Sequence, residues 1–214
     1  MYLVELHSII ENGENSKVEF KRKFTEPDKI AKEMVAFANT KGGMILFGVD
    51  DDREIIGIES EKAELELIDI AAKFHCEPEI DYHTEILCIK NKDVLIIHIP
   101  ESKRKPHYLI NDNDISKNKV YIRNKDKSVI ASRETISILK YSNPDSKPFI
   151  FTLGKIEKQL IEILKVKERI TVKEFKKLAN ISERRASRTI VNLIRAGILF
   201  HHIDGEYEYF TIIE

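Results

Sequence analysis

A glycine pair, Gly42 and Gly43, stands between two patterned segments and limits the folds open to this chain. Before it, residues 27–39 place apolar side chains at helical spacing behind a proline that suits a first helical turn. After it, MILFGV is a continuous apolar run that predicts a buried strand. Because glycine permits the positive φ of a sharp turn, we expect a helix, a tight turn and a core strand that ends at the acids of residues 50–52.

The same order argues against a nucleotide site at these glycines. A P-loop needs a strand before its glycines and a Gly-Lys-Ser/Thr step into a helix, and the dinucleotide fingerprint has the same order of elements. Here the helix precedes the glycines, and the chain contains no Gly-Lys-Ser or Gly-Lys-Thr. We therefore expect no ATP or NAD site, and no resident cofactor.

A proline-containing stretch, YSNPDSKPF, divides the chain. Pro, Ser and Asn clustered between patterned segments are typical of a linker. We place a first domain at residues 1–141, a linker at 142–149 and a second domain at 150–214. In the first domain the patterns predict an α+β fold with a mixed, largely antiparallel sheet. We expect helices at 2–10, 27–39, 61–74 and 132–141, and strands at 17–21, 44–49, 54–58, 85–90, 93–99 and 119–123.

The composition indicates the cellular compartment of the protein and the kinds of partner that it binds. Two cysteines are too few for a secreted disulfide framework, and no apolar run approaches the roughly 20 residues that span a bilayer. We expect a cytoplasmic protein without a membrane partner. Lys plus Arg (35) nearly cancels Asp plus Glu (36), but from Ile150 onward there are 12 basic and 9 acidic residues. This asymmetry favours an anionic partner for the C-terminal part.

The C-terminal part has the element order of a winged helix-turn-helix domain. Helical patterns occupy residues 155–165, 171–181 and 182–197, and an Asp-Gly turn at Asp204 and Gly205 joins two alternating runs into a hairpin. Thr171 and Ser182 are suited to cap the second and third helices, and Gly197 to end the third in a left-handed conformation.

The third of these helices divides into an apolar and a basic arc at 100° per residue. In a helix-turn-helix domain the exposed face of this helix enters the major groove, where arginine and asparagine contact base edges and phosphates. The alternative is a solvated basic face on a protein-binding winged helix. The apolar arc holds Ala186, Ile190, Leu193 and Ile194, and the predicted nucleic-acid contacts are Arg184, Arg185, Arg188, Asn192 and Arg195.

Several linked segments of the first domain resemble the Schlafen AlbA-like domain, once labelled a divergent AAA domain. These segments are GENSKVEFKRK, MVAFANTKGGMILFGVDDDREIIGI, KPHYLI and KVYIRNKDKSVIAS, and the resemblance covers about residues 11–141. It implies a nucleic-acid-binding α+β domain that pairs with a second copy, so we expect a homo-oligomer, with a dimer favoured. Bacterial members often carry a C-terminal winged helix and are described as transcriptional regulators. Our main hypothesis is therefore a DNA-binding regulator that prefers duplex DNA to RNA.

The vertebrate Schlafen relatives imply an enzymatic alternative, because some of them cleave transfer RNA with three acids in these motifs. The matching positions here are Glu14, Glu19 and Asp51, with Asp50 as a second choice for the last. Such acids could hold Mg²⁺ or Mn²⁺ and activate a water for phosphodiester attack. A structural explanation stays open, in which Glu19 pairs with a lysine and the aspartates form a polar turn. The alternative function is a metal-dependent endoribonuclease acting on structured RNA, whereas the main hypothesis is not an enzyme.

Basic residues beside the family motifs could neutralise phosphates on either hypothesis. Lys21, Arg123 and Lys125 are the predicted contacts, and residues 22–23, 103–105 and 127 add to the positive charge. Tyr108 and Tyr121 could stack on bases or lie half-buried.

Two further groups of residues could suggest a metal or a phosphate contact. His75, Cys76, His83 and Cys88 lack the spacing of a structural zinc site, so we expect buried thiols instead. His201 and His202 are expected on the strand that enters the wing, where they could touch a phosphate.

Overall fold

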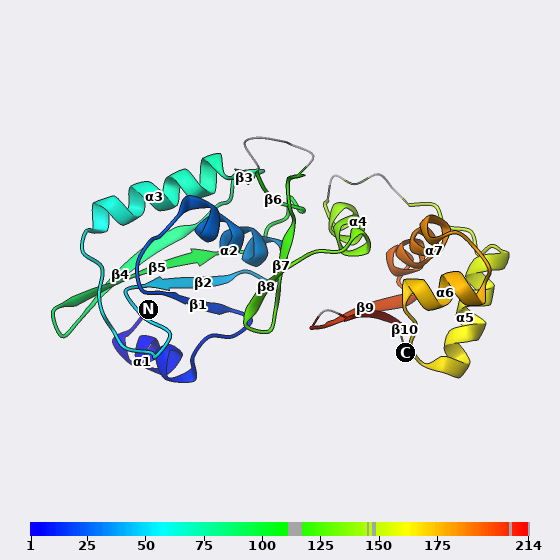
Figure 1. The fold of residues 1–214 in the computed structure, drawn as a ribbon, viewed down its shortest axis with the longest axis horizontal. Helices are drawn as coiled ribbons and strands as arrows, with labels where there is room; N and C mark the ends of the chain where they lie inside the picture. The colour runs from blue at the N-terminus through cyan, green and yellow to red at the C-terminus, as the bar shows by residue number, and fades with distance from the viewer. Residues whose placement is uncertain (111–116, 145, 147–148, 206, 214) are drawn as a thin grey trace. The chain divides into compact units, whose positions relative to one another are not determined.

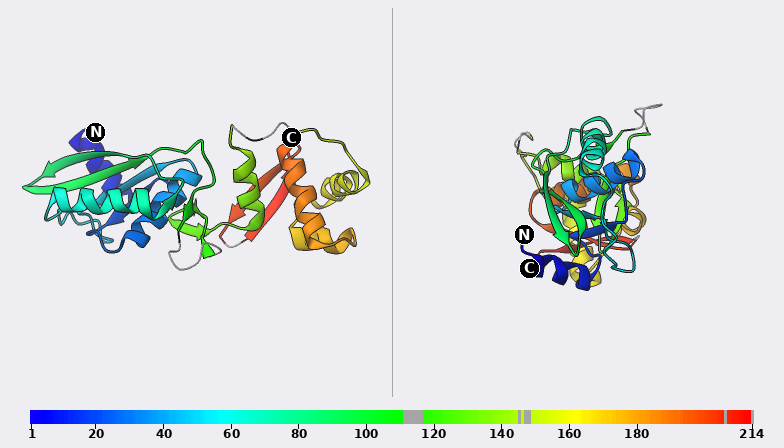
Figure 2. Two further views of the ribbon diagram at one scale, coloured as in Figure 1. Left: turned by 90° about the horizontal axis from the view of Figure 1, so that it is seen from above. Right: turned by 90° about the vertical axis from the view of Figure 1, so that its left-hand side faces the viewer.

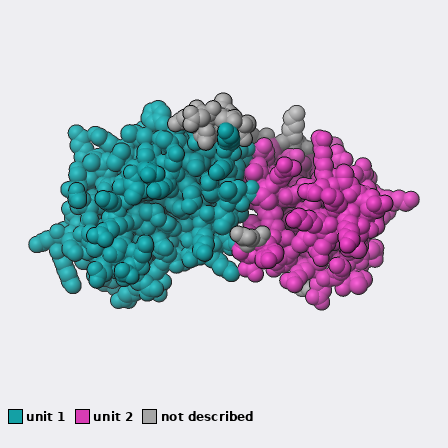
Figure 3. Space-filling view, in the orientation of Figure 1, with its two compact units in different colours: residues 1–131 teal, residues 132–214 magenta. Residues whose placement is uncertain are grey.

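The computed structural model describes residues 1–110, 117–144, 146, 149–205 and 207–213. It divides into two compact units, residues 1–131 and 132–214, which Figure 3 colours separately. The helix of residues Arg133–Tyr141 groups with the second unit, although its sequence pattern had been assigned to the first domain. Residues 145, 147 and 148 of the predicted linker lie outside the described residues, so the domain boundaries stay a prediction.

A four-stranded sheet in the order β1-β2-β5-β4 forms the centre of unit 1. The pair β1-β2 is parallel, and the pairs β2-β5 and β5-β4 are antiparallel, which confirms the mixed, largely antiparallel sheet of an α+β fold. Three further strand pairs complete the described strands of the chain, two of them in this unit. The strands of unit 1 are β1 Val18–Lys21, β2 Gly43–Phe47, β3 Cys76–Glu77, β4 His83–Ile89, β5 Lys92–Ile99, β6 Tyr108–Leu109, β7 Tyr121–Asn124 and β8 Lys127–Ile130.

Helices cover both faces of this sheet, as Figures 1 and 2 show. Helices α2 (Pro27–Asn39) and α3 (Glu61–Phe74) lie on one face, and α1 (Leu3–Asn12) lies on the other. Successive side chains of a strand point to opposite faces, so Ile45 and Phe47 pack with α2 and α3 while Leu46 packs with α1. Burial on both faces explains why MILFGV is apolar without alternation.

The glycine pair makes the predicted turn from α2 into β2. Gly42 has φ +67°, and its amide donates to the Phe37 carbonyl (2.9 Å), which closes the end of the helix. A Cβ at Gly42 would lie 2.6 Å from the Ile99 carbonyl oxygen, and one at Gly43 would overlap the Phe37 ring. The pair is therefore required by the backbone turn and by close packing.

Three details of the sequence analysis were wrong. Residues 54–58 form no strand but a bent segment, with a single bridge between Val49 and Ile55, because the amides of Ile56 and Gly57 both donate to the Gly48 carbonyl. Strand β8 was not predicted, since KSVI carries little apolar pattern. Cys88 is exposed, whereas Cys76 is buried as expected, and burial raises the pKa of its thiol to about 12.

Unit 2 contains the three helices and the hairpin that were predicted after the linker, in the predicted order, together with the helix of residues Arg133–Tyr141. The hydroxyls of Thr171 and Ser182 accept backbone hydrogen bonds as N-caps, and Gly197 has φ +68° after the third helix. A bridge between Ile170 and Phe210 joins the hairpin to the segment between the first two of these three predicted helices. The elements of unit 2 are α4 Arg133–Tyr141, α5 Lys155–Lys167, α6 Val172–Leu178, α7 Glu183–Arg195, β9 Leu199–Asp204 and β10 Tyr207–Ile212. Within the described part of the chain, no helix has the length and apolar character needed to cross a membrane.

Candidate nucleic-acid interface

Helix α7 separates a buried apolar face from an exposed basic face. Ala186, Ile190 and Leu193 are 0% exposed and pack in the core of unit 2. Arg184, Arg185 and Arg188 are exposed, and together they are called the α7 basic face below. The Ser182 hydroxyl accepts from the Arg185 amide (3.3 Å), so the helix begins directly before its arginines. The sequence thus predicted the three arginines on the correct side of the helix.

Charged neighbours at the start of α7 leave this face positive. Glu183 is an acid in the first turn, but its carboxylate pairs with Lys176 of α6 at 3.0 Å. The hydrogen bond from Lys176 is the main reason why the pKa of Glu183 is lowered. Since Lys176 offsets this carboxylate, the three arginines dominate the local charge.

Arg195 does not extend the α7 basic face. Its guanidinium carbon lies 3.6 Å from the ring centroid of Tyr141 and 4.0 Å from that of Phe149. Helix α4, which ends at Tyr141, packs alongside α7 (Figure 1). The two aromatic rings hold the guanidinium, and the contact of Arg195 with nucleic acid stays a prediction. The only sequence signals for this contact are an aromatic residue directly before the predicted linker and one at its end. Asn192 lies half-buried on the same helix.

Arg123 is also not a surface contact. Its side chain is 0% exposed, and its guanidinium pairs with Glu19 (2.9 Å) and Glu33 (3.0 Å). The guanidinium also donates to the Asn15 carbonyl (2.8 Å) and lies 4.6 Å from the Phe37 ring centroid. The predicted phosphate contact at Arg123 is therefore corrected: this arginine ties the β7-β8 hairpin to β1 and α2 inside unit 1.

The three predicted acids lie near one another. Glu14 accepts a hydrogen bond from the Phe20 amide (2.7 Å). Burial is the main reason why the pKa of Glu14 is raised; the Phe20 hydrogen bond opposes this, and the negative charges of Glu19 and Asp51 add to it. The carboxylate of Glu14 therefore interacts electrostatically with both other acids, and a catalytic role for the three stays a prediction.

The same acids do not fit a divalent metal in this arrangement. Glu19 is 8% exposed and is bound by Arg123 and by Lys21. Those two cations already supply the positive charge that a metal would bring. Among the described residues, no group of three or more His, Cys, Asp or Glu side chains is placed to hold a metal ion.

The remaining predicted residues are spread over unit 1. Lys21 forms an ion pair with Glu19, whereas Lys125 is exposed at the turn between β7 and β8. Tyr108 and Tyr121 are half-buried. His75 does not approach a metal-ligand set but contacts Asp28 (2.6 Å). Of these residues, Lys21 directly contacts one of the three acids.

Comparison with known proteins bears mainly on unit 1. A family model described as Schlafen, AlbA_2 matches residues 14–132, more than half of the chain. A curated relative from Ureaplasma parvum serovar 3, described as an uncharacterized ATP-binding protein, UU034, is 33% identical over 100 residues. That match covers 42% of this chain and only 28% of the relative.

Two solved structures are similar at lower identity. The DIP2311 protein from Corynebacterium diphtheriae is 17% identical, with a TM-score of 0.49, over 77% of this chain and 34% of its own. The N-terminal domain of a protein described as related to the ATP-dependent DNA helicase RecG, from Nitrosomonas europaea, is 19% identical, with a TM-score of 0.42, over 61% of this chain and 92% of its own.

Proposed function

The chain belongs to the Schlafen, AlbA_2 family, and we propose that it is a nucleic-acid-binding protein of the cytoplasm that acts as a transcriptional regulator. In this proposal unit 2 is a winged helix that docks on duplex DNA through α7. The observation that carries the proposal is the α7 basic face, three exposed arginines opposite a fully buried apolar face. Arginine is the side chain that most often reads guanine and clamps phosphate.

The topology of unit 2 supports the winged-helix interpretation. Helices α5, α6 and α7 precede the β9-β10 hairpin, and the isolated Ile170–Phe210 bridge ties the segment between α5 and α6 to it. In a helix-turn-helix domain with this order, α7 is the recognition helix and its N-terminal residues contact base edges. All three arginines of the α7 basic face lie in the first two turns of α7.

A pair of matched double variants tests the proposal. Arg185→Ala/Arg188→Ala removes two cations from the α7 basic face, and we expect duplex affinity to fall by about tenfold or more, since each such contact contributes about 1–3 kcal/mol. The control, Lys155→Ala/Lys158→Ala, removes two exposed cations from α5 in the same unit. Fluorescence anisotropy with a labelled duplex measures both. Equal affinities for the two variants would contradict docking through α7.

For unit 1 we propose pairing with a second copy and further contacts with the phosphate backbone. The exposed cations Lys103, Arg104 and Lys125 support the backbone contacts, because they need not read sequence. Light scattering of the full chain tests the pairing, and a monomeric mass at micromolar concentration would exclude a stable dimer.

The ribonuclease alternative is favoured by one observation, the electrostatic interaction of Glu14 with Glu19 and with Asp51. For Glu19 to bind a metal ion, its ion pair with Arg123 would have to break. We therefore propose nucleic-acid binding without cleavage as the activity of this chain. Asp51→Asn is the sharper test, because Asp51 is exposed and its replacement leaves the buried ion pairs intact. Manganese-dependent cleavage of transfer RNA by the native chain that Asp51→Asn abolishes would establish the enzyme instead.

ATP binding is ascribed to one relative, of which this chain spans 28%. In this chain the glycine stretch has little capacity for phosphate, because the Gly42 amide donates to Phe37 and the Met44 amide to Lys17. We therefore do not extend ATP binding to this chain.

A further inference from the structure

The β9-β10 hairpin carries aromatic side chains on its outer face. Its register pairs His202 with Tyr209, and a strand alternates its side chains between two faces. Leu199 and Phe210 point inward and are 1% and 0% exposed. The opposite set points outward and is called the outer hairpin face below; it consists of Phe200, His202, Tyr207 and Tyr209.

Three of these four rings contact one another in a row, through one stacked pair and one edge contact. The rings of His202 and Tyr209 lie 4.7 Å apart and within 4° of parallel. Phe200 meets the edge of His202 at 4.8 Å. Phe200 and Tyr207 are 55% and 78% exposed, far more than a core side chain would be. The rings therefore form an ordered apolar surface that is exposed to solvent in this chain.

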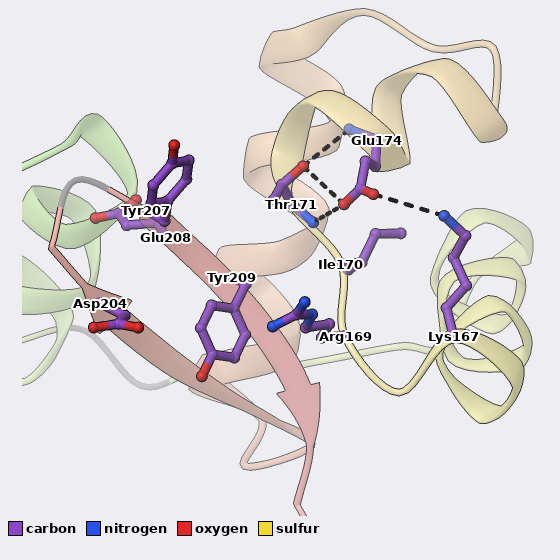
Figure 4. Close-up of a pocket in the computed structure, with 9 residues that line it drawn as sticks. All are labelled: Lys167, Arg169, Ile170, Thr171, Glu174, Asp204, Tyr207, Glu208 and Tyr209. Atoms are coloured by element: carbon purple, nitrogen blue, oxygen red, sulfur yellow. Dashed lines mark hydrogen bonds and ion pairs between the residues drawn. The ribbon is translucent and has the colours of Figure 1, made fainter.

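A pocket of about 560 Å³ adjoins this face and places cations beside it (Figure 4). Tyr207 and Tyr209 line it from the hairpin, Lys167 lines it from the end of α5, and Arg169 from the turn that follows. The Arg169 guanidinium lies 5.6 Å from the Tyr209 ring centroid. Within the described residues Arg169 makes no ion pair, so its charge is available to a ligand.

The acids of the pocket are engaged by other groups. Glu174 accepts from the amide and the hydroxyl of Thr171, and its carboxylate lies 3.6 Å from Lys167. Glu208 accepts from the Thr135 hydroxyl (2.6 Å) and lies 3.5 Å from His201. Burial raises the pKa of Glu208, but hydrogen bonds from His201, Thr135 and Ser132 outweigh it, and the net shift is downward. Asp204 is the remaining carboxylate in the pocket.

Exposed rings beside an unpaired guanidinium suit one kind of ligand. A nucleotide presents the flat π-face of its base to the rings, and its phosphate attracts the cation. Bases in a duplex are stacked on one another, so only unpaired bases can reach such a surface.

We propose that the outer hairpin face binds unpaired nucleobases by stacking, so that unit 2 holds single-stranded or locally opened nucleic acid at the hairpin. This surface is separate from the α7 basic face and does not depend on duplex docking there.

The chain contains no tryptophan, so one introduced ring gives an unambiguous signal. We would make Tyr207→Trp, a conservative change at a 78% exposed position, and follow its fluorescence while adding a single-stranded oligonucleotide. Stacking of a base on the indole is expected to quench the emission. Leu178→Trp, on α6 at 49% exposure and outside the pocket, is the matched control and should not respond.

Two further oligonucleotides identify the group that is recognised. An abasic strand of the same length keeps the phosphates, and a duplex hides the bases, so both should quench much less. Tyr209→Ala should weaken single-strand binding about tenfold, in line with the usual contribution of one stacked base. Arg185→Ala/Arg188→Ala should retain the quench, which separates this result from failure of duplex docking.

Absence of quenching at saturating single strand would overturn the proposal. Equal quenching by the abasic strand or by the duplex would overturn it as well, because the face would then recognise the backbone alone. Circular dichroism confirms that each variant keeps the native helix content.

Discussion

At the scale of single residues, the environment of an arginine decides what it does. Arg185 and Arg188 are solvated, Arg195 is held between two rings, and Arg123 is enclosed by carboxylates. A guanidinium suits all three settings, because it is planar, weakly hydrated and always charged. Residue type alone therefore could not separate the ligand contacts from the structural ones.

Arg123→Met should be among the most destabilising single changes in unit 1. It removes the partner of two buried carboxylates, Glu19 and Glu33, and breaking a buried pair in this way costs about 3–5 kcal/mol. Urea denaturation measures the loss. The control is Lys127→Ala at the exposed start of β8, which should change the free energy of unfolding by no more than about 0.5 kcal/mol. Equal stabilities of the two variants would contradict the buried network.

The position of Arg123 shows where sequence periodicity fails. In KVYIR the alternation puts Ile122 on one face of the strand and Arg123 on the other, which is correct. Both whole residues, backbone included, are nevertheless only 5% exposed, because β1 and α2 cover the second face. A local pattern gives the face of a side chain but not the segment, about 90 to 104 residues away in the chain, that covers it.

At the scale of elements, the two positive-φ turns behave differently under the same substitution. Gly42 and Gly197 have φ +67° and +68°, so alanine at either position costs about 1–2 kcal/mol in backbone strain. A Cβ at Gly197 meets nothing within 4 Å, whereas one at Gly42 lies 2.6 Å from a backbone oxygen. Gly42→Ala should therefore destabilise the chain clearly more than Gly197→Ala. Thermal or urea unfolding compares them, and equal losses would mean that strain alone decides.

Strongly periodic elements were predictable and weakly patterned ones were not. Helices α2, α3 and α7 were found because their apolar side chains recur at helical spacing, and Pro27 and Ser182 agree with the starts of α2 and α7. The segment at 54–58 looked like a strand, but Gly48 and Gly57 bend it against β5. In the candidate site, the exposed arginines of α7 followed from helix geometry, whereas the rings around Arg195 come from α4 and the linker and could not be placed from sequence.

At the scale of the whole molecule, the chain combines a family domain with a unit of different character. Unit 1 buries an ion-pair network of Arg123, Glu19 and Glu33, while unit 2 presents the α7 basic face and the outer hairpin face to solvent. We therefore propose that unit 2 carries most of the nucleic-acid recognition and that Glu19 and Glu33 of unit 1 have a structural role.

The salt dependence of duplex binding tests this central claim most directly. Each phosphate neutralised by a protein cation steepens the plot of log affinity against log salt by about 0.9. We predict a steep negative slope for the full chain between about 50 and 200 mM salt, and a slope less steep by about two for Arg185→Ala/Arg188→Ala. The Lys155→Ala/Lys158→Ala control should keep the native slope. A native chain without salt-dependent duplex binding, or an α7 variant with the native slope and affinity, would contradict the account.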